Sequence, residues 1–387
     1  METNFLEFFA PTRVLAGAGL VESLGQEVSR LGWSRCFIVT DSFMRESGQL
    51  ERVLAGLRSG PVEVAGIFDE AVPDSEVSIV ERCAKRAGEA SPDCILALGG
   101  GSVIDTAKAA NILLTLGGEL LDYEGFGLID SPLTPLLAIP TTAGSGSEVT
   151  QFAVIKHQAR QAKLSFFSPY LVPSAAVLDP EMTVSLPPSL TATTGMDALT
   201  HAIEAHLSTS ANPIASGLAL QAVRLIFTYL PRAVHEGYDP GARQAMLLAA
   251  SMAGMAFSST MVGVVHAAAH ACGGLYGVPH GLANAILLPH GMLYNLQVAA
   301  AKLADIAHAA GTRETGLSHE EYGRKAVAAV EQLCAQCGLQ QRLKDTGLPR
   351  DGLAAVAELA AVDGAVFTNP RPAEADDILK LLEDAYE

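Results

Sequence analysis

Four histidines lie close together in one long apolar stretch, at His266, His270, His280 and His290. Residues 244–301 contain no Asp, Glu, Lys or Arg, so we expect this stretch to be buried. An unpaired polar group in a protein interior costs about 1–3 kcal/mol, so buried imidazoles need partners. One histidine in such a stretch is usually an ordinary core residue, but four at this density indicate a common partner. A metal ion is the obvious one, and its carboxylate ligand must come from elsewhere in the chain.

A carboxylate and a fifth histidine occur together earlier in the chain. Asp197 and His201 are four residues apart in a predicted helix, so both side chains point to one face. Alone, such a pair is more often a simple hydrogen bond than half of a metal site. Combined with the apolar stretch, it completes a ligand set that suits Zn²⁺ or Fe²⁺, since Mg²⁺ and Ca²⁺ prefer oxygen ligands. The histidines outside these groups are predicted to lie at the surface or to cap helices; they are His157, His206, His235, His308 and His319.

A glycine-rich segment, Gly99-Gly100-Gly101-Ser102, joins a predicted buried strand at 94–98 to a predicted helix at 103–114. Glycines let backbone N–H groups approach a ligand closely, and a helix N-terminus favours an anion. The segment is neither G-x-G-x-x-G nor a P-loop, and a tight strand-to-helix turn would also explain it. Its place at the carboxyl end of a strand, where ligands bind in open α/β sheets, favours a phosphate-binding loop.

Two further segments follow predicted strands in the same half of the chain. Asp41 comes directly after the strand at 36–40, where an acid can bind a ribose 2′-hydroxyl and repel a 2′-phosphate, or can cap the next helix. Residues 140–150 (PTTAGSGSEVT) follow the strand at 136–139 and combine hydroxyls with glycines. A flexible turn is the simpler interpretation of that segment, but its position beside the glycine-rich loop favours contact with a cofactor or substrate.

The elements that position these residues follow two patterns. In the first half, short apolar strands alternate with amphipathic helices, which predicts a doubly wound, mostly parallel sheet. Further strands are predicted within 5–20 (a short pair) and at 62–68, 152–156 and 163–167, with helices at 48–57 and 76–87, the latter ended by Gly88. From about residue 185 the pattern is helical, with helices predicted at 191–207, 213–230, 242–257, 260–272, 281–298, 301–311, 318–337, 350–361 and 374–386. We therefore predict an α/β nucleotide-binding domain at 1–185 and an all-helical metal-binding domain at 186–387, divided at the helix-breaking Leu186-Pro187-Pro188.

Composition excludes several classes of partner. The net charge of -17 disfavours nucleic acid and anionic lipid, although backbone N–H groups can still hold an anionic cofactor. The six cysteines show no disulfide framework, and the pair Cys334 and Cys337 is interpreted as two ordinary helix residues. The first residues lack the features of a secretory signal, and the Gly, Pro, Asn and His content of the charge-free stretch argues against a membrane span. These features predict a soluble, cytoplasmic protein.

Several of these motifs together resemble the iron-containing (group III) alcohol dehydrogenase family. The resemblance extends over nearly the whole chain and depends on the segments GGGSVIDTAKA, IPTTAGSGSEVT, GMDALTHAIEA and HAAAHACGGLYGVPHGLANAILLPH. It implies a dehydroquinate synthase-like architecture, with the active site in a cleft between the two domains. It also implies a hydride transfer between a small alcohol or aldehyde and NAD, rather than NADP, in a homodimer or higher homo-oligomer.

The resemblance implies a role for individual residues. The divalent metal, Fe²⁺ or alternatively Zn²⁺, would be held by Asp197, His201, His266 and His280, with His270 as the proton-relay residue near the nicotinamide. The cofactor would contact Asp41, Gly99, Gly100, Gly101, Ser102, Thr141, Thr142 and Lys163. Phe152 and Phe257 would form walls of the substrate pocket, and His290 is interpreted as structural.

Two other functions stay open on the sequence alone. One is a metal-dependent lyase or cyclase of the dehydroquinate synthase type, but such enzymes need basic residues for a polyanionic substrate, and the charge-free stretch has none. The other is a non-catalytic metal- or nucleotide-binding protein, which would give no change in nicotinamide absorbance with any alcohol. The sequence specifies neither the alcohol nor the metal.

Overall fold

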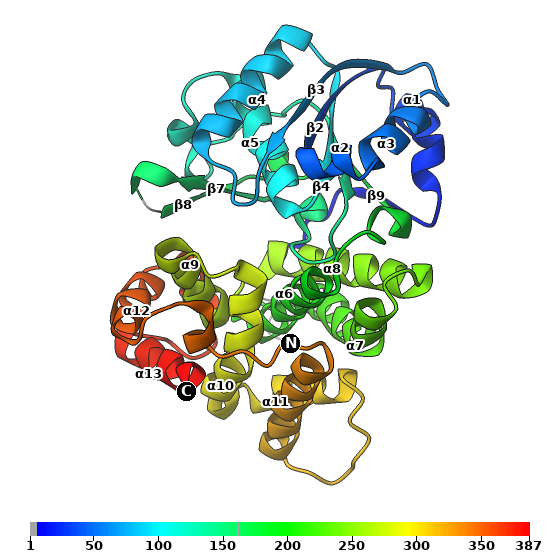
Figure 1. The fold of residues 1–387 in the computed structure, drawn as a ribbon. Coiled ribbons are helices and arrows are strands. Elements are labelled where there is room, and N and C mark those ends of the chain that lie inside the picture. The colour runs from blue at the N-terminus through cyan, green and yellow to red at the C-terminus, as the bar shows by residue number, and fades with distance from the viewer. Residues whose placement is uncertain (1–5, 161) are drawn as a thin grey trace. The chain divides into compact units, whose positions relative to one another are not determined.

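The computed structural model describes residues 6–160 and 162–387, and this chain divides into two compact units (Figure 1). The first unit comprises Ala10–Leu186 and Tyr238–Ser251 and contains the strands of the described chain. The second comprises residues 6–9, Pro187–Gly237 and Met252–Glu387 and is helical. The prediction of an α/β part followed by an all-helical part is therefore confirmed.

The first unit is built on a six-stranded parallel sheet. Its strands lie in the order β1 (Arg13–Ala16), β9 (Ala175–Leu178), β6 (Leu136–Pro140), β4 (Cys94–Gly99), β2 (Arg35–Asp41) and β3 (Glu63–Ala71). A separate three-stranded sheet has the order β5 (Gly125–Phe126), β8 (Ala162–Phe167) and β7 (Phe152–His157). The sequence predicts a pair of strands within 5–20, but residues 6–20 of the described chain contain β1 as their one strand. Residue 5 is not among the described residues. The sequence prediction omits β9, because its four residues AAVL are too short for a recognisable pattern.

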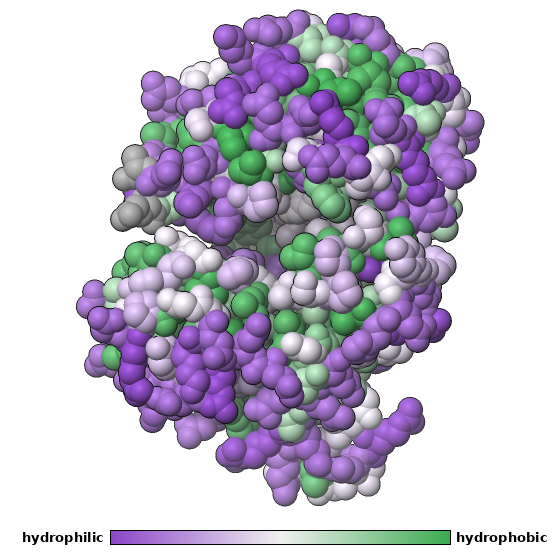
Figure 2. Space-filling view, in the orientation of Figure 1, coloured by the Kyte–Doolittle hydropathy of each residue, from purple (hydrophilic) through white to green (hydrophobic). Residues whose placement is uncertain are grey.

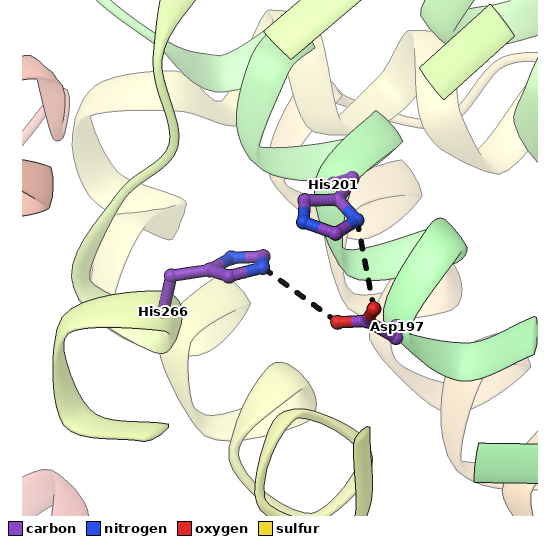
Figure 3. A group of neighbouring side chains, drawn as sticks. All are labelled: Asp197, His201 and His266. Atoms are coloured by element: carbon purple, nitrogen blue, oxygen red, sulfur yellow. Dashed lines mark ion pairs between the residues drawn. The ribbon is translucent and has the colours of Figure 1, made fainter. Parts of the chain in front are cut away.

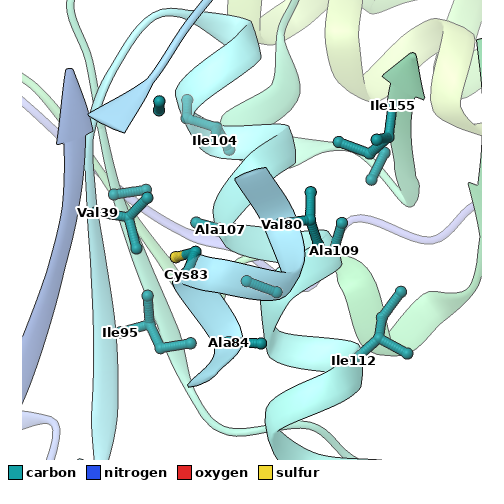
Figure 4. Close-up of a cluster of buried hydrophobic side chains, with 14 of the residues drawn as sticks. Val39, Val80, Cys83, Ala84, Ile95, Ile104, Ala107, Ala109, Ile112 and Ile155 are labelled. Carbon is teal, nitrogen blue, oxygen red and sulfur yellow. The ribbon is translucent and has the colours of Figure 1, made fainter. Parts of the chain in front are cut away.

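Helices cover both faces of the parallel sheet (Figure 1). They are α1 (Leu24–Arg30), α2 (Ser42–Glu46), α3 (Gln49–Leu57), α4 (Val77–Ala90) and α5 (Gly101–Leu116). Along β2, Phe37 and Val39 pack with α4 and α5, while Cys36 and Ile38 pack with α1 and α3. This alternation follows from the two-residue period of a strand. Figure 4 shows the first of these cores, and full burial of each such side chain is worth about 1.5–3 kcal/mol.

One helix in this unit ends later than predicted. The sequence prediction ends the helix before Gly88, but α4 continues through Gly88 to Ala90. The residue that ends it is Ser91, which adopts a left-handed conformation with φ of 47°. A glycine inside a helix costs only about 0.5–1 kcal/mol relative to alanine, which the buried face of α4 outweighs.

The second unit contains long helices with strongly apolar faces. They are α6 (Pro188–Leu207), α7 (Pro213–His235), α9 (Val264–Tyr276), α10 (His280–Ala309), α11 (His319–Gln336), α12 (Leu353–Ala361) and α13 (Ala375–Tyr386), together with the end of α8 (Pro240–Thr260). The two predicted helices at 281–298 and 301–311 are one element with a kink at Ala299. The helix predicted to begin at residue 260 begins instead at Val264, after Met261 adopts a positive φ of 64°.

The surface visible in Figure 2 is mostly hydrophilic, with scattered apolar residues. Within the described chain, α7 is long and apolar enough to cross a membrane by length and composition, and α8 with α9 pass the same test as a bent pair. Core helices pass this test too, and α7 buries Ala219, Val223 and Ile226 against its neighbours. The test therefore gives little support for a membrane span.

Candidate functional site

Asp197 and His201 on α6 and His266 on α9 form a buried cluster (Figure 3). Their potential ligand atoms all lie within 4.8 Å of one another. Asp197 Oδ1 lies 3.8 Å from Nε2 of His266, and its Oδ2 lies 3.9 Å from Nδ1 of His201. One carboxylate thus faces an imidazole on each of two helices.

His280, the first residue of α10, extends this cluster. Its Nε2 lies 3.3 Å from Asp197 Oδ1, and its side chain is 32% exposed while those of Asp197 and His266 are buried. The next residue, Gly281, packs against the backbone of α6, because a Cβ there would lie 2.6 Å from the carbonyl oxygen of Thr193. The structure therefore brings together the four residues that the sequence suggested as ligands, and His280 is the most exposed of them.

The donor set fits a divalent transition metal. Among the described residues, the buried Nδ1 of His201 has no hydrogen-bond partner. A bound metal ion would give this nitrogen a partner. One carboxylate with three imidazoles is a typical set for zinc or iron. His280 lies beside this group, with its Nε2 3.3 Å from Asp197 Oδ1.

The protonation states also favour metal binding. Burial lowers the pKa of His201 to about 3 and places the pKa of His266 well below its ordinary value. Burial opposes ionisation of Asp197, but the neighbouring imidazoles outweigh this and lower its pKa. Metal ligands must be deprotonated, and each of these shifts is in the direction of the ligand form.

Asn284, one turn after His280 on α10, is a neighbour of the cluster that sequence reasoning missed. Its Nδ2 donates to Asp197 Oδ1 at 2.7 Å and lies 3.2 Å from Nε2 of both His266 and His280. Asn284 is fully buried, and its spacing of four residues from His280 is the one sequence signal that could have indicated it. It holds the carboxylate of Asp197 toward the imidazoles.

His270 lies beside the cluster and has a carboxylate partner. Its ring stacks on that of His280 with centroids 5.4 Å apart, and its Nδ1 lies 2.9 Å from Oδ2 of Asp363. Burial works against ionisation of Asp363, but the hydrogen bonds from His270 and from the backbone N–H of Ala365 help to lower its pKa. Asp363 therefore accepts from Nδ1–H, which leaves Nε2 of His270 free to exchange a proton. Sequence reasoning missed Asp363, which is far from His270 in the chain.

The remaining histidines lie apart from this cluster. Burial lowers the pKa of His290, and the charges that oppose this shift are those of Asp384 and Glu331, not those of the candidate ligands. The prediction that His206 lies at the surface or caps a helix is wrong, because its side chain is buried and lies 3.5 Å from Asp305. His206 sits on the buried face of α6, so helix packing decides its position.

The two predicted pocket residues belong to different units. Phe257 stacks on the ring of His201 with centroids 4.3 Å apart, so it lies against a candidate ligand. Phe152 begins β7 in the sheet unit, where its ring contacts Phe167 with centroids 4.9 Å apart. Phe257 is thus placed next to a candidate metal ligand, whereas the ring of Phe152 packs within its own sheet.

The predicted cofactor segments gather at one edge of the parallel sheet. The adjacent strands β2, β4 and β6 end at Asp41, Gly99 and Pro140, and parallel strands place these ends on the same side. The glycine-rich loop packs tightly on the following loop, since a Cβ on Gly101 would lie 2.5 Å from Oγ of Ser145. A Cβ on Gly100 would lie 3.3 Å from Thr142. The two loops therefore lie directly against each other at this edge of the sheet.

Asp41 and Lys163 also lie in this unit. Asp41 caps α2, because its Oδ1 accepts from the backbone N–H of Met44 at 2.9 Å. Lys163 Nζ lies 2.7 Å from Oδ1 of Asp74, whose backbone N–H donates to Oγ of Ser102 at 3.2 Å. Lys163 is thus linked through Asp74 to the glycine-rich loop.

Helix α5 anchors the threonine-containing loop through a buried lysine and a half-buried aspartate. Lys108 Nζ donates to the carbonyl oxygens of Thr150 and Phe152 at 2.8 Å and 2.7 Å. Asp105, one turn earlier, accepts from the hydroxyl of Ser147 and from the backbone N–H of Val154. The same helix that begins at the glycine-rich loop therefore also fixes the loop and strand that follow β6.

Comparison with known proteins identifies the family. The model of the iron-containing alcohol dehydrogenase family matches residues 11–180, and the C-terminal model of the same family matches residues 191–386. The chain belongs to the iron-containing alcohol dehydrogenase family. The predicted family and enzyme class are thus confirmed, and this family member is an alcohol dehydrogenase.

Relatives within this family match over the full length. A 1,3-propanediol dehydrogenase from Klebsiella pneumoniae is 38% identical, with both chains covered completely. An NAD-dependent methanol dehydrogenase from Bacillus methanolicus is 36% identical over 98% of this chain and 99% of its own. The crystal structure of a 1,3-propanediol oxidoreductase superposes with a TM-score of 0.96 at 38% identity, covering 99% of this chain and 100% of the other.

Proposed function

We propose that this alcohol dehydrogenase transfers a hydride reversibly between a small primary alcohol or diol and NAD. A divalent iron ion would be held by Asp197, His201, His266 and His280, with zinc as the alternative. The observation that carries the proposal is the convergence of these four residues from three helices, with one carboxylate in contact distance of each imidazole. When bound, the metal supplies Lewis-acid chemistry at the substrate oxygen.

The residues around the cluster have defined roles in this proposal. His280 is the most exposed of the four candidate ligands, so substrate would approach there, and the aromatic ring of Phe257 excludes water beside His201. Asp363 orients His270, whose free Nε2 would accept or return the hydroxyl proton. The site is largely buried, and burial strengthens electrostatic interactions within it.

The choice of NAD is supported by Asp41. Its carboxylate stands at the end of β2, where it can accept from a ribose 2′-hydroxyl and would repel the phosphate of NADP. The glycine-rich loop would hold the pyrophosphate, Thr141 and Thr142 the nicotinamide half, and Lys163 the ribose side. The relatives named as methanol and 1,3-propanediol dehydrogenases support a small substrate. We further propose a soluble, cytoplasmic homodimer or higher homo-oligomer, which light scattering on the purified protein would test.

The proposal is tested by metal reconstitution followed by a substrate screen. The purified protein is stripped with a chelator and reloaded anaerobically with Fe²⁺ or Zn²⁺. It is then mixed with methanol, ethanol, 1-propanol, 1,3-propanediol or their aldehydes, and either nicotinamide cofactor. We expect absorbance changes with NAD that require added metal.

Two histidines on α10 provide a matched pair of variants. His280→Ala should lose metal and turnover, whereas His290→Ala should retain both, because His290 lies outside the cluster. Full activity of His280→Ala after exhaustive chelation would refute the ligand assignment. If no alcohol or aldehyde changed the absorbance of the reloaded wild type, the protein would instead be a non-catalytic binder.

A further inference from the structure

The N-terminus of α9 is capped by residues from other parts of the chain. The first amides of a helix have no carbonyl partner within it, and a Ser, Thr, Asp or Asn at the N-cap usually supplies one. The N-cap of α9 is Gly263, which has no side chain to do so. The carboxylate of Glu204 instead accepts from the backbone N–H groups of Gly263 at 2.9 Å and Val265 at 2.8 Å. Oδ1 of Asn369 accepts from Val264 at 3.2 Å.

The same carboxylate bonds the imidazole of a candidate ligand. Oε2 of Glu204 lies 2.6 Å from Nδ1 of His266 and 3.4 Å from the backbone nitrogen of that residue. Burial raises the pKa of Glu204 to about 7, but the backbone N–H groups of Gly263, Val265 and His266 point at its oxygens and favour the ionised form. We therefore assign the shared proton to Nδ1 of His266. The neutral ring then has its lone pair on Nε2, the atom that faces Asp197 Oδ1.

Steric fit shows that this arrangement is closely packed. A Cβ on Gly263 would lie 2.8 Å from Oε1 of Glu204 and 2.8 Å from Oδ1 of Asn369, so a larger residue would displace both caps. Glu204 is three residues after His201 and seven after Asp197 on α6, so the three share one helix face. Its side chain is buried, and a buried carboxylate is tolerated only where hydrogen bonds compensate its charge.

We propose that Glu204 is a positioning residue that fixes the ring orientation and tautomer of His266 for metal binding, while it closes the N-terminus of α9. The inference rests on the proposed metal-binding function. Carboxylates that accept from the second nitrogen of a ligating histidine typically contribute about 10–100-fold to metal affinity. Helix α6 would thus supply two ligands directly and would control a third through Glu204.

Two variants separate the positioning role from the capping role. Glu204→Gln retains an acceptor for the backbone N–H of Val265. It places an NH₂ group against Nδ1 of His266, which favours the wrong tautomer, and the same group faces the backbone N–H of Gly263. Asn369→Ala removes a cap from the same helix end without touching His266. Affinity for Zn²⁺ is measured by competition with a chromogenic chelator, and the melting temperature of the metal-free protein reports on folding. We expect Glu204→Gln to lose about 10–100-fold in affinity and Asn369→Ala to lose melting temperature with little change in affinity.

A measurement on the wild-type chain does not depend on the variants folding. Histidine labelled with nitrogen-15 distinguishes ring nitrogens that carry a proton from those that bind metal. In the zinc-loaded protein we expect His266 to be protonated at Nδ1 and metal-bound at Nε2. A proton on Nε2 of His266, or a Glu204→Gln variant that binds zinc as tightly as wild type, would overturn the inference while leaving the proposed function intact. A wild-type chain that bound neither Zn²⁺ nor Fe²⁺ would overturn both.

Discussion

Replacing Lys108 by methionine tests the buried network that anchors the loop after β6. Lys108 is 1% exposed, and methionine has a similar length but no donor. The substitution leaves the carbonyl oxygens of Thr150 and Phe152 without this donor and removes the cation that faces Asp105 and Glu148. These losses act on one buried site, so they should appear as a single large change in stability.

The expected magnitude follows from the number of groups that lose their partner. Two buried carbonyl oxygens cost about 1–3 kcal/mol each. Removing the buried ammonium group offsets part of this cost in free energy. Burial lowers the pKa of Lys108 to about 8, which shows that its charged form is destabilised in the folded protein. Breaking a buried charged arrangement by removing one partner generally costs about 3–5 kcal/mol, and we expect a value in this range.

The single tryptophan of the chain provides the assay. Trp33 packs on a hydrophobic core of the same unit as Lys108, so its fluorescence during urea unfolding reports on that unit. Lys163→Met is the control, because Lys163 pairs with Asp74, whose side chain is 61% exposed. Exposed pairs contribute about 0–1 kcal/mol. If the two variants differed by less than about 1 kcal/mol, the network would not be the anchor described above.

Three further results are expected. Asp363→Asn should lower kcat by about tenfold or more at nearly constant KM, because His270 would lose the carboxylate that orients its ring. General acid–base catalysis contributes at least a factor of about ten to the rate. An unchanged kcat in steady-state assays would exclude an orienting role for Asp363. Asp41→Gly should bring the kcat/KM values for NAD and NADP closer together while costing only a few tenths of a kcal/mol in helix capping, and an unaltered ratio would remove Asp41 from cofactor selection. In urea titrations, Zn²⁺ at about a hundred times its dissociation constant should raise the free energy of unfolding of the wild type by about 2.7 kcal/mol. The same Zn²⁺ concentration should leave the free energy of unfolding of His280→Ala unchanged.

The sequence indicates those site residues whose chemistry is unusual for their surroundings. Histidines at helical spacing within a charge-free stretch, and an aspartate one turn from a histidine, are such cases. Glu204 stands in the same segment as Asp197 but gave no signal, because a helical glutamate is ordinarily solvated. Only the tertiary contact with α9 reveals its burial.

Long-range partners are the second class that the sequence does not reveal. Asp363 lies 93 residues from His270 along the chain, and no local pattern connects them. The alternation of strands and helices, by contrast, is a local pattern, and it predicts the parallel sheet and the edge where Asp41 and the glycine-rich loop meet. The local sequence predicts where each strand ends. Which strands lie next to one another depends on the order of the strands in the sheet, which the local sequence does not give.

The six cysteines of the described chain, all reduced and buried, make the protein suitable for thiol-labelling experiments. Cys36, Cys83 and Cys94 belong to the sheet unit, and the remaining three belong to the helical unit. A thiol reagent can modify such groups only when the surrounding structure opens, so labelling rates measure opening free energies. Mass spectrometry of the labelled peptides would therefore report the opening of each unit separately, without any engineered probe.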